Sequence, residues 1–220
     1  MYECEFCREL SNDPQSTAKS SRVIFHSRRF AIVPSLGPLH PYHLLICSRR
    51  HVTGLHELSP LELSEVEILF GAVERVFGYI HGTNFVAFEN GTDQGSMPSC
   101  SIEHYHLHVI PVARRVTMAD IGQAKASVPS ISEAAQYARI LRNYILVKAP
   151  GHSFELASRQ GLASQHVRRI VAALNGYSEW DWRRVERPSD WAQKRVALKP
   201  FVDRLYYELE QYASHNMVAA

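Results

Sequence analysis

The sequence predicts an α+β protein in which a sheet is flanked by helices. Three stretches of its 220 residues carry this prediction. Residues 22–33 have the pattern of two short apolar strands around a tight turn, and residues 104–110 alternate histidine with apolar residues at the strand period of two. Residues 59–82 place apolar residues at helical spacing between a capping sequence and a glycine stop.

The first half of the chain combines further strands with this one long helix. Residues 41–51 contain an apolar strand, and Ser59 is expected to cap the helix with Pro60 at its first position. Residues 84–90 form the strand that precedes the histidine stretch. The loop between them, residues 91–101, is small and polar, so it can offer backbone N–H groups and hydroxyls to a phosphate.

The second half, residues 114–220, is predicted to be mainly helical. Apolar stripes indicate three helices, over residues 132–141, 164–174 and 192–213. The last is expected to break or kink near Pro200, and residues 144–156 have the pattern of a β-hairpin. No Gly/Ser- or Pro-rich linker follows Pro111, so we expect the second half to pack on the histidine-bearing sheet.

Three histidines at every second position dominate the chemistry of the sequence. His104, His106 and His108 share one face of the predicted strand, with rings about 6.5–7 Å apart. An imidazole is mostly neutral at pH 7, because its ordinary pKa is about 6.5. The middle ring is therefore a candidate nucleophile that forms a phosphohistidine, with an imidazole on either side. A histidine-rich exposed strand or a bare metal site is the alternative.

The stretch from His104 to Ile110 resembles the histidine-triad (HIT) motif, in which three histidines alternate with apolar residues before an apolar pair. Phe88-Glu89-Asn90, a loop and then Cys100-Ser101 resemble the galactose-1-phosphate uridylyltransferase branch of that superfamily. His108 stands where those transferases have glutamine, as in the hydrolases. A histidine can pass a proton to a leaving group, which glutamine cannot do.

This resemblance implies a HIT-like catalytic domain over residues 1–113, built on an antiparallel sheet with flanking helices. Residues 114–220 would then be a mainly helical C-terminal extension, with a hairpin, packed on that sheet. The resemblance also implies that His106 attacks the α-phosphorus of a nucleotide, while His108 and Ser101 stabilise charge on the phosphoryl oxygens.

Five further residues are expected to bind the substrate: Asn90, Ser35, Leu36, Ser99 and Arg183. Ser35 stands where the family has its ribose-binding acid, and a hydroxyl cannot take both ribose hydroxyls as a carboxylate does. Arg183 lies in a segment with two tryptophans beside arginines, which can stack a base and hold a phosphate. The alternative for this segment is the edge of a core.

Cys4 and Cys7 form a Cys-x-x-Cys pair, which by itself does not fill a tetrahedral zinc site. Histidines are the plentiful candidates for the other two ligands. By resemblance to zinc-carrying HIT proteins, His51 and His104 complete a structural Zn²⁺ site. Two buried thiols without a metal are the alternative, since the four cysteines of this chain do not form a disulfide framework.

Positive charge is concentrated in the second half of the chain. Residues 1–113 contain 8 Lys/Arg and 12 Asp/Glu, whereas residues 114–220 contain 16 and 10. Either a solvated surface or a basic half that closes over a phosphorylated ligand accounts for the difference. In the second case we expect phosphate contacts from four arginines, Arg168, Arg169, Arg183 and Arg184.

The sequence has no run of 18 apolar residues, so we expect no membrane-spanning helix. Its first residues lack the basic and apolar parts of a signal peptide, which favours a cytoplasmic location. The expected ligand is a nucleotide or nucleotide conjugate, without sequence-specific binding to nucleic acid. A homodimer is compatible with all of these features.

Two functions remain open on the sequence. The first is a nucleotidyl hydrolase or transferase that works through a covalent nucleotidyl-histidine. Its acceptor can be water, phosphate as in a phosphorylase, or a sugar phosphate as in the uridylyltransferases. The second is a non-catalytic nucleotide-binding module that meets a partner through its second half. The presence of all three histidines favours the enzyme.

Overall fold

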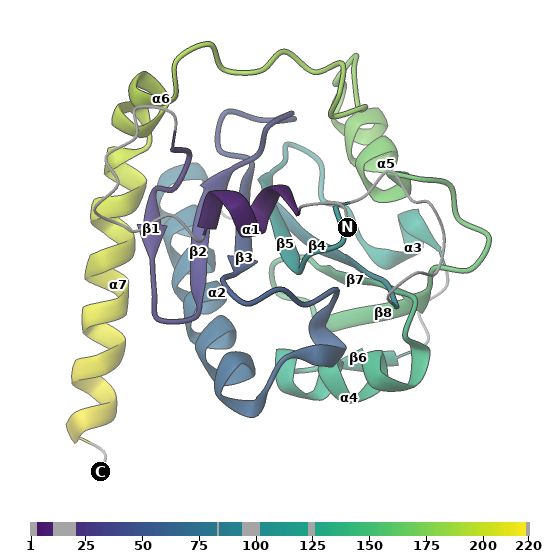
Figure 1. Cartoon of the computed structure of the whole chain (residues 1–220), viewed down its shortest axis with the longest axis horizontal. Helices are drawn as coiled ribbons and strands as arrows, with labels where there is room; N and C mark the ends of the chain where they lie inside the picture. Colours follow the sequence, from purple (N-terminus) through teal and green to yellow (C-terminus); the bar gives the residue numbers. More distant parts are fainter. Residues whose placement is uncertain (1–3, 11–20, 83, 94–101, 123–125, 219–220) are drawn as a thin grey trace.

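One antiparallel sheet runs through both halves of the chain in the computed structural model, which describes residues 4–10, 21–82, 84–93, 102–122 and 126–218 (Figure 1). Within these residues eight strands lie in the order β1-β2-β3-β5-β4-β7-β8-β6, and every neighbouring pair is antiparallel. Their bounds are β1 Phe25–His26, β2 Phe30–Pro34, β3 Leu44–Ser48, β4 Phe85–Gly91, β5 His106–Pro111, β6 Ala126–Val128, β7 Tyr144–Lys148 and β8 Phe154–Ser158. The predicted α+β class with an antiparallel sheet and flanking helices is confirmed.

Helices cover both faces of this sheet. Their bounds are α1 Glu5–Leu10, η1 Leu55–Glu57, α2 Pro60–His81, α3 Met118–Ile121, α4 Ile131–Leu141, α5 His166–Asn175, α6 Trp191–Ala197 and α7 Lys199–Val218. The largest core joins one face of the sheet to α2, α4 and α7. In Figure 1, α1 crosses the opposite face over β2 and β3, while α3 and α5 lie on that face towards β7 and β8. Among the described helices, none is long and apolar enough to cross a membrane.

Strand β5 sits in the middle of the sheet and separates two kinds of side chain. Leu107 and Val109 point into the largest core. Because successive side chains of a strand point to opposite faces, His106, His108 and Ile110 lie on the other face. Ile110 belongs to the core beneath α3 and α5, while a separate small core lies beneath α1. The two histidines therefore lie between two apolar cores.

The predicted start of the long helix α2 is confirmed in detail. The Ser59 hydroxyl accepts a hydrogen bond from the Glu62 N–H, and the Glu62 carboxylate accepts one from the Ser59 N–H. Pro60 occupies the first helical position, where its missing N–H costs nothing. Gly82 ends the helix with a φ of 69°, the left-handed conformation that favours glycine.

The second half contributes more to the sheet than its helical pattern suggested. The predicted hairpin forms as β7 and β8, and β7 pairs with β4 from Ala87 opposite Lys148 to Gly91 opposite Tyr144. Four successive residues of β7, from Tyr144 to Val147, are buried, as expected for a strand covered on both faces. The short β6 joins the sheet as well. The last predicted helix is broken at Leu198, so Pro200 lies in the first turn of α7.

A buried carboxyl group lies where the two halves of the sheet meet. Glu89 of β4 is 1% exposed and accepts a hydrogen bond from the Tyr144 hydroxyl at 2.8 Å and from the Leu55 N–H at 3.1 Å. Desolvation raises the pKa of Glu89 to about 8, although these two hydrogen bonds act in the opposite direction. Glu89 is therefore protonated in the folded protein at pH values where it is ionised in the unfolded chain.

This pKa predicts how stability depends on pH. Between about pH 4.5 and pH 8 folding takes up a proton at Glu89, so the free energy of unfolding falls as the pH rises through that window. This fall in the free energy of unfolding is expected to be on the order of a few kcal/mol, and it should be absent in Glu89→Gln, which cannot take up the proton. Urea unfolding at pH 5 and pH 9 measures the difference. The exposed Glu210→Gln is the control, and an equal pH dependence in Glu89→Gln and the wild type would contradict the prediction.

The pairing of β7 with β4 predicts the result of truncation. A chain that ends at Ala113 lacks β7, which exposes the edge of β4 and the apolar side chains Val86 and Phe88. We expect residues 1–113 alone to be insoluble or unfolded by circular dichroism. Co-expression of residues 114–220 as a separate chain is the control, since it can restore the sheet. A soluble 1–113 fragment that turns over the substrate with an unchanged KM would show the second half to be an appendage.

Candidate active site

A pocket of about 640 Å³, its open mouth included, lies over β5 between the two cores of that face. His106 and His108 form its floor, and residues from both halves of the chain form its walls. Phe6 of α1 and Leu45 of β3 line one side, while Gln165 and Trp182 line the side that belongs to the second half.

Backbone geometry orients the ring of His106. Its Nδ1 lies 2.6 Å from the backbone carbonyl oxygen of His104, which can only accept, so Nδ1 carries the proton and donates. In the neutral ring Nε2 then keeps a free lone pair. Desolvation lowers the pKa of His106, and the nearby charge of Arg168 acts in the same direction. The ring is therefore held neutral, in the tautomer that a nucleophile needs.

A second histidine fixes the tautomer of His108. The Leu39 N–H donates to Nδ1 of His43, so the proton of the neutral His43 ring lies on Nε2. That Nε2 lies 2.9 Å from Nδ1 of His108 and donates to it. His108 consequently carries its own proton on Nε2, as a hydrogen-bond donor. Its ring stacks on Phe88 with centroids 4.4 Å apart, which fixes the plane of the ring.

The position of His104 differs from the predicted one. Strand β5 begins at His106, and His104 lies in a bend before it. Its ring does not line the pocket, so the expected arrangement with an imidazole on either side of His106 is wrong. The rings of His106 and His108 have centroids 4.9 Å apart, closer than the predicted spacing of about 6.5–7 Å, because the two rings lean together edge to face.

His104 instead joins Cys4, Cys7 and His51 in a cluster whose ligand atoms all lie within 4.8 Å of one another. Its Nδ1 lies 3.4 Å from Sγ of Cys4 and 3.6 Å from Sγ of Cys7. Nδ1 of His51 lies 3.2 Å from Sγ of Cys7. Tetrahedral Zn²⁺ bonds of about 2.0–2.3 Å place neighbouring ligand atoms about 3.4–3.8 Å apart, so the arrangement fits a metal ion of this kind.

The protonation of this cluster also fits a metal site. Nε2 of His104 lies 2.6 Å from the Ser48 carbonyl and donates to it, which leaves the Nδ1 lone pair directed at the thiols. Desolvation lowers the pKa of His104 to about 4, so the ring is neutral. Burial and the adjacent Cys4 raise the pKa of Cys7 to about 11, so a metal must displace its thiol proton.

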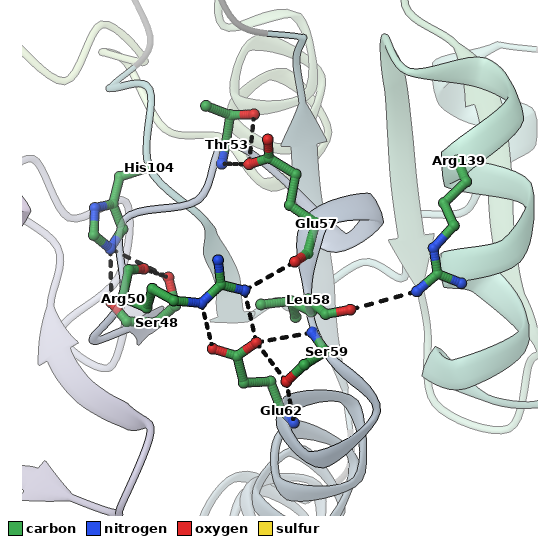
Figure 2. Close-up of polar contacts among 9 residues, drawn as sticks. All are labelled: Ser48, Arg50, Thr53, Glu57, Leu58, Ser59, Glu62, His104 and Arg139. Carbon is green, nitrogen blue, oxygen red and sulfur yellow. Dashed lines mark hydrogen bonds and ion pairs between the residues drawn. The ribbon is translucent and has the colours of Figure 1, made fainter.

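A polar network holds the segment that carries His51 (Figure 2). The Arg50 guanidinium donates to the Glu62 carboxylate at 2.8 and 3.0 Å and to the Glu57 carbonyl. This pairing lowers the pKa of Glu62 to about 2, so its carboxylate caps α2 and binds Arg50 at the same time. The Thr53 N–H donates to the Glu57 side chain. The loop between β3 and α2 is thereby fixed beside the cluster.

The residues predicted to bind the substrate are found in different places. Ser35, Leu36 and Asn90 line the pocket with the two histidines. Ser99 and Ser101 lie outside the described residues. Arg183 is not among the residues that line the pocket. Its guanidinium lies over the Trp182 ring, 4.7 Å from the centroid, and 3.7 Å from the Asp181 carboxylate.

Of the other polar residues that line the pocket, only some were predicted from the sequence. Arg168 was expected to contact phosphate and does line the pocket, whereas Arg22, Arg159 and Gln165 carried no local signal in the sequence. His43 lies in the stretch of residues 41–51 that was predicted to contain an apolar strand, but its contact with His108 spans 65 residues of sequence. A contact between residues so far apart in the chain produces no spacing pattern from which it could be predicted.

Comparison with known proteins identifies the first half of the chain. Residues 16–115 match the family model described as the HIT domain. The chain is 27% identical over 93 residues to the asymmetrical bis(5'-nucleosyl)-tetraphosphatase of Schizosaccharomyces pombe, covering 41% of this chain and 49% of that protein. It is 31% identical over 101 residues to an AP-4-A phosphorylase of Mycobacterium tuberculosis, covering 44% and 50%. The chain thus spans about half the length of these curated relatives.

A solved structure of a hypothetical protein from Leishmania major is also similar, with 21% identity and a TM-score of 0.43 over 63% of this chain and 93% of that one. The matched family model includes β1 to β5 and the whole stretch from His104 to Pro111. Residues 16–115 of the chain are therefore a HIT domain by sequence match.

Proposed function

We propose that the protein is a nucleotidyl hydrolase or transferase that forms a covalent adduct between His106 and the α-phosphate of a nucleotide. The observation that carries this proposal is the pair of fixed tautomers in the pocket. His106 keeps a lone pair on Nε2, while the adjacent His108 presents an N–H from its own Nε2. One ring can attack phosphorus while the other donates to an oxygen of the same group.

The proposed reaction has two displacements. Nε2 of His106 attacks the α-phosphorus, a bond from phosphorus to the leaving group breaks, and a nucleotidyl-histidine results. The N–H of His108 stabilises charge on a phosphoryl oxygen and can pass its proton to the leaving group. In the second displacement an acceptor breaks the N–P bond and regenerates neutral His106. Asn90, Ser35 and Leu36 are the proposed substrate contacts, because they line the same pocket.

The acceptor is a separate question from the nucleophile. The names of the similar proteins include a tetraphosphatase, which uses water, and a phosphorylase, which uses phosphate. Both names indicate dinucleoside polyphosphates, and this chain spans about half of each protein. A substrate panel with and without inorganic phosphate, read by phosphorus NMR, distinguishes hydrolysis from phosphorolysis. A uridylyltransferase-like reaction would require a sugar phosphate in the same assay.

The nucleophile is tested by His106→Ala and His106→Asn. We expect turnover to fall about a thousandfold or more while nucleotide binding changes little, because the variants lose a reaction path and only one contact. The exposed His152→Ala is the control. A His106→Ala protein with more than about a tenth of wild-type activity would exclude the covalent mechanism. Binding without turnover by the wild type would instead indicate a nucleotide-binding module.

We further propose that Cys4, Cys7, His51 and His104 hold a structural Zn²⁺. Two thiolates and two imidazoles complete a tetrahedral shell and leave no open position for a substrate. The ion would tie α1 to the bend that carries His104. The carbonyl of that residue accepts the hydrogen bond from His106, so the metal would support the nucleophile without taking part in the reaction.

The zinc proposal predicts about one equivalent of Zn²⁺ per chain by elemental analysis after purification without chelators. Chelation should lower the melting temperature and should not inhibit competitively, because the ligand shell is closed. Cys7→Ala should lose the metal, whereas Cys47→Ala, which removes a thiol in β3 outside the cluster, should keep it. Less than about a tenth of an equivalent in the wild type would refute the assignment.

A further inference from the structure

The pocket is lined by positive and neutral side chains alone, as far as the described residues show. Three arginines, Arg22, Arg159 and Arg168, line it together with the two histidines, and its described lining contains no aspartate or glutamate. Arg22 is neutralised by an ion pair with Glu9 and donates to the Pro34 carbonyl. The other two arginines come from the second half of the chain.

Arg168 is a buried cation without an ion pair among the described residues. The residue is 4% exposed, its Nε donates to the Trp180 carbonyl at 3.0 Å and one terminal nitrogen donates to the Gly37 carbonyl at 2.8 Å. These bonds use two of the five N–H donors of a guanidinium. The Asp181 carboxylate acts on Arg168 from a distance and raises its pKa, but desolvation is the larger effect and lowers that pKa to about 10. A buried charge without a direct ion pair is costly, so this site favours an anionic ligand that can take the remaining donors.

The two carbonyls also fix where the guanidinium lies. Gly37 follows the predicted substrate contacts Ser35 and Leu36, and Trp182 lies against it. A Cβ at Gly37 would lie 2.5 Å from the Trp182 carbonyl oxygen, so no other residue fits there without displacing the segment around Trp182. Arg168 thereby joins the loop after β2 to the second half of the chain, directly at the wall of the pocket.

The charge of Arg168 also acts on the histidines. It lowers the pKa of His43 and His108 in addition to the larger effect of desolvation. Arg159 reaches the same pocket from the residue that follows β8. The two arginines therefore approach the histidines from separate elements, α5 and the end of β8.

We propose that Arg168 and Arg159 form a second anion subsite beside the histidines, and that the substrate carries a phosphate joined to the one that His106 attacks. This inference rests on the proposed function and narrows it to nucleotides with a phosphoanhydride bond. His106 and His108 take the α-phosphate, and the arginine pair takes the next phosphate along the chain. Guanidinium groups suit this role, because their N–H donors match the spacing of phosphate oxygens. A nucleoside phosphoramidate or monophosphate lacks the group that this subsite binds.

The test compares AMP with ADP, which differ by the second phosphate. Binding is measured by calorimetry in magnesium-free buffer, in a His106→Asn background that prevents turnover. We expect ADP to bind about tenfold more tightly than AMP, the scale of one charge-assisted hydrogen bond. Arg168→Gln should bring this ratio near one while the affinity for AMP changes by less than about threefold.

Two further variants make the comparison independent of folding defects. Arg159→Gln alters a half-buried residue and should lower the ADP-to-AMP ratio by about threefold or more. Arg169→Gln is the matched control, since Arg169 adjoins Arg168 on α5 but is exposed and lies over the Trp180 ring. This control should keep the ADP-to-AMP affinity ratio of the His106→Asn protein in which all variants are made. Melting curves check that each variant is folded.

The inference would be overturned if the His106→Asn protein binds ADP no more tightly than AMP, or binds neither. An unchanged ratio in both Arg168→Gln and Arg159→Gln would also overturn it. If Arg168→Gln does not fold, the Arg159→Gln result decides alone. Failure of the proposed function has a different signature, because it appears as wild-type protein without turnover or as turnover that survives His106→Ala.

Discussion

The geometry of the site depends on one residue, His104. Its side chain belongs to the Cys/His cluster, and its backbone carbonyl orients the ring of His106. The ring lies between the Ser48 carbonyl and the two thiols, so its position is set by the Cys/His cluster. The carbonyl of the same residue accepts the hydrogen bond that gives His106 its tautomer. Because both groups belong to one residue, a movement of the His104 ring would disturb the hydrogen bond that orients His106, the candidate nucleophile. A structural cluster and a candidate catalytic group are thereby coupled over a very short path.

The sheet explains why a site can exist at this place. Apolar side chains cover one face of β5 without interruption, whereas the other face is divided between a small core under α1 and a larger one under α3 and α5. Polar side chains on a central strand are costly unless they are hydrogen-bonded. His108 has such a partner in His43, and His106 has one in a backbone carbonyl. The interval between the two cores is therefore polar, and both of its imidazoles have hydrogen-bond partners.

The second half of the chain contributes both to the sheet and to this site. Its hairpin continues the sheet past β4, and α5 then brings a buried arginine to within electrostatic range of three imidazoles. Desolvation, together with this positive charge, keeps the imidazoles neutral, and the charge also attracts anions. In the described residues the pocket offers no carboxylate to balance it. Asp181 acts on Arg168 without forming an ion pair with it, so an anionic ligand is expected to complete the balance of charge inside the pocket.

Local chemistry was sufficient to predict much of this protein. The alternation in β5, the cap at Ser59 and the stop at Gly82 each depend on residues a few positions apart, and each was predicted from the sequence. The four residues of the Cys/His cluster were also named in advance, but only through a family resemblance, since Cys4 and His104 are 100 positions apart.

The sequence could not determine the contacts between distant segments. The period of two predicted that His104 lies in the strand. In the structure His104 lies in a bend before β5, where its ring contacts Ser48 and the two thiols. The hydrogen bond from His43 to His108, the approach of Trp182 to Gly37 and the burial of Arg168 all arise when separate elements pack together. Periodicity determines which face of an element is apolar. The tertiary structure alone decides which polar groups meet across the space between elements, because that depends on how the helices and strands dock.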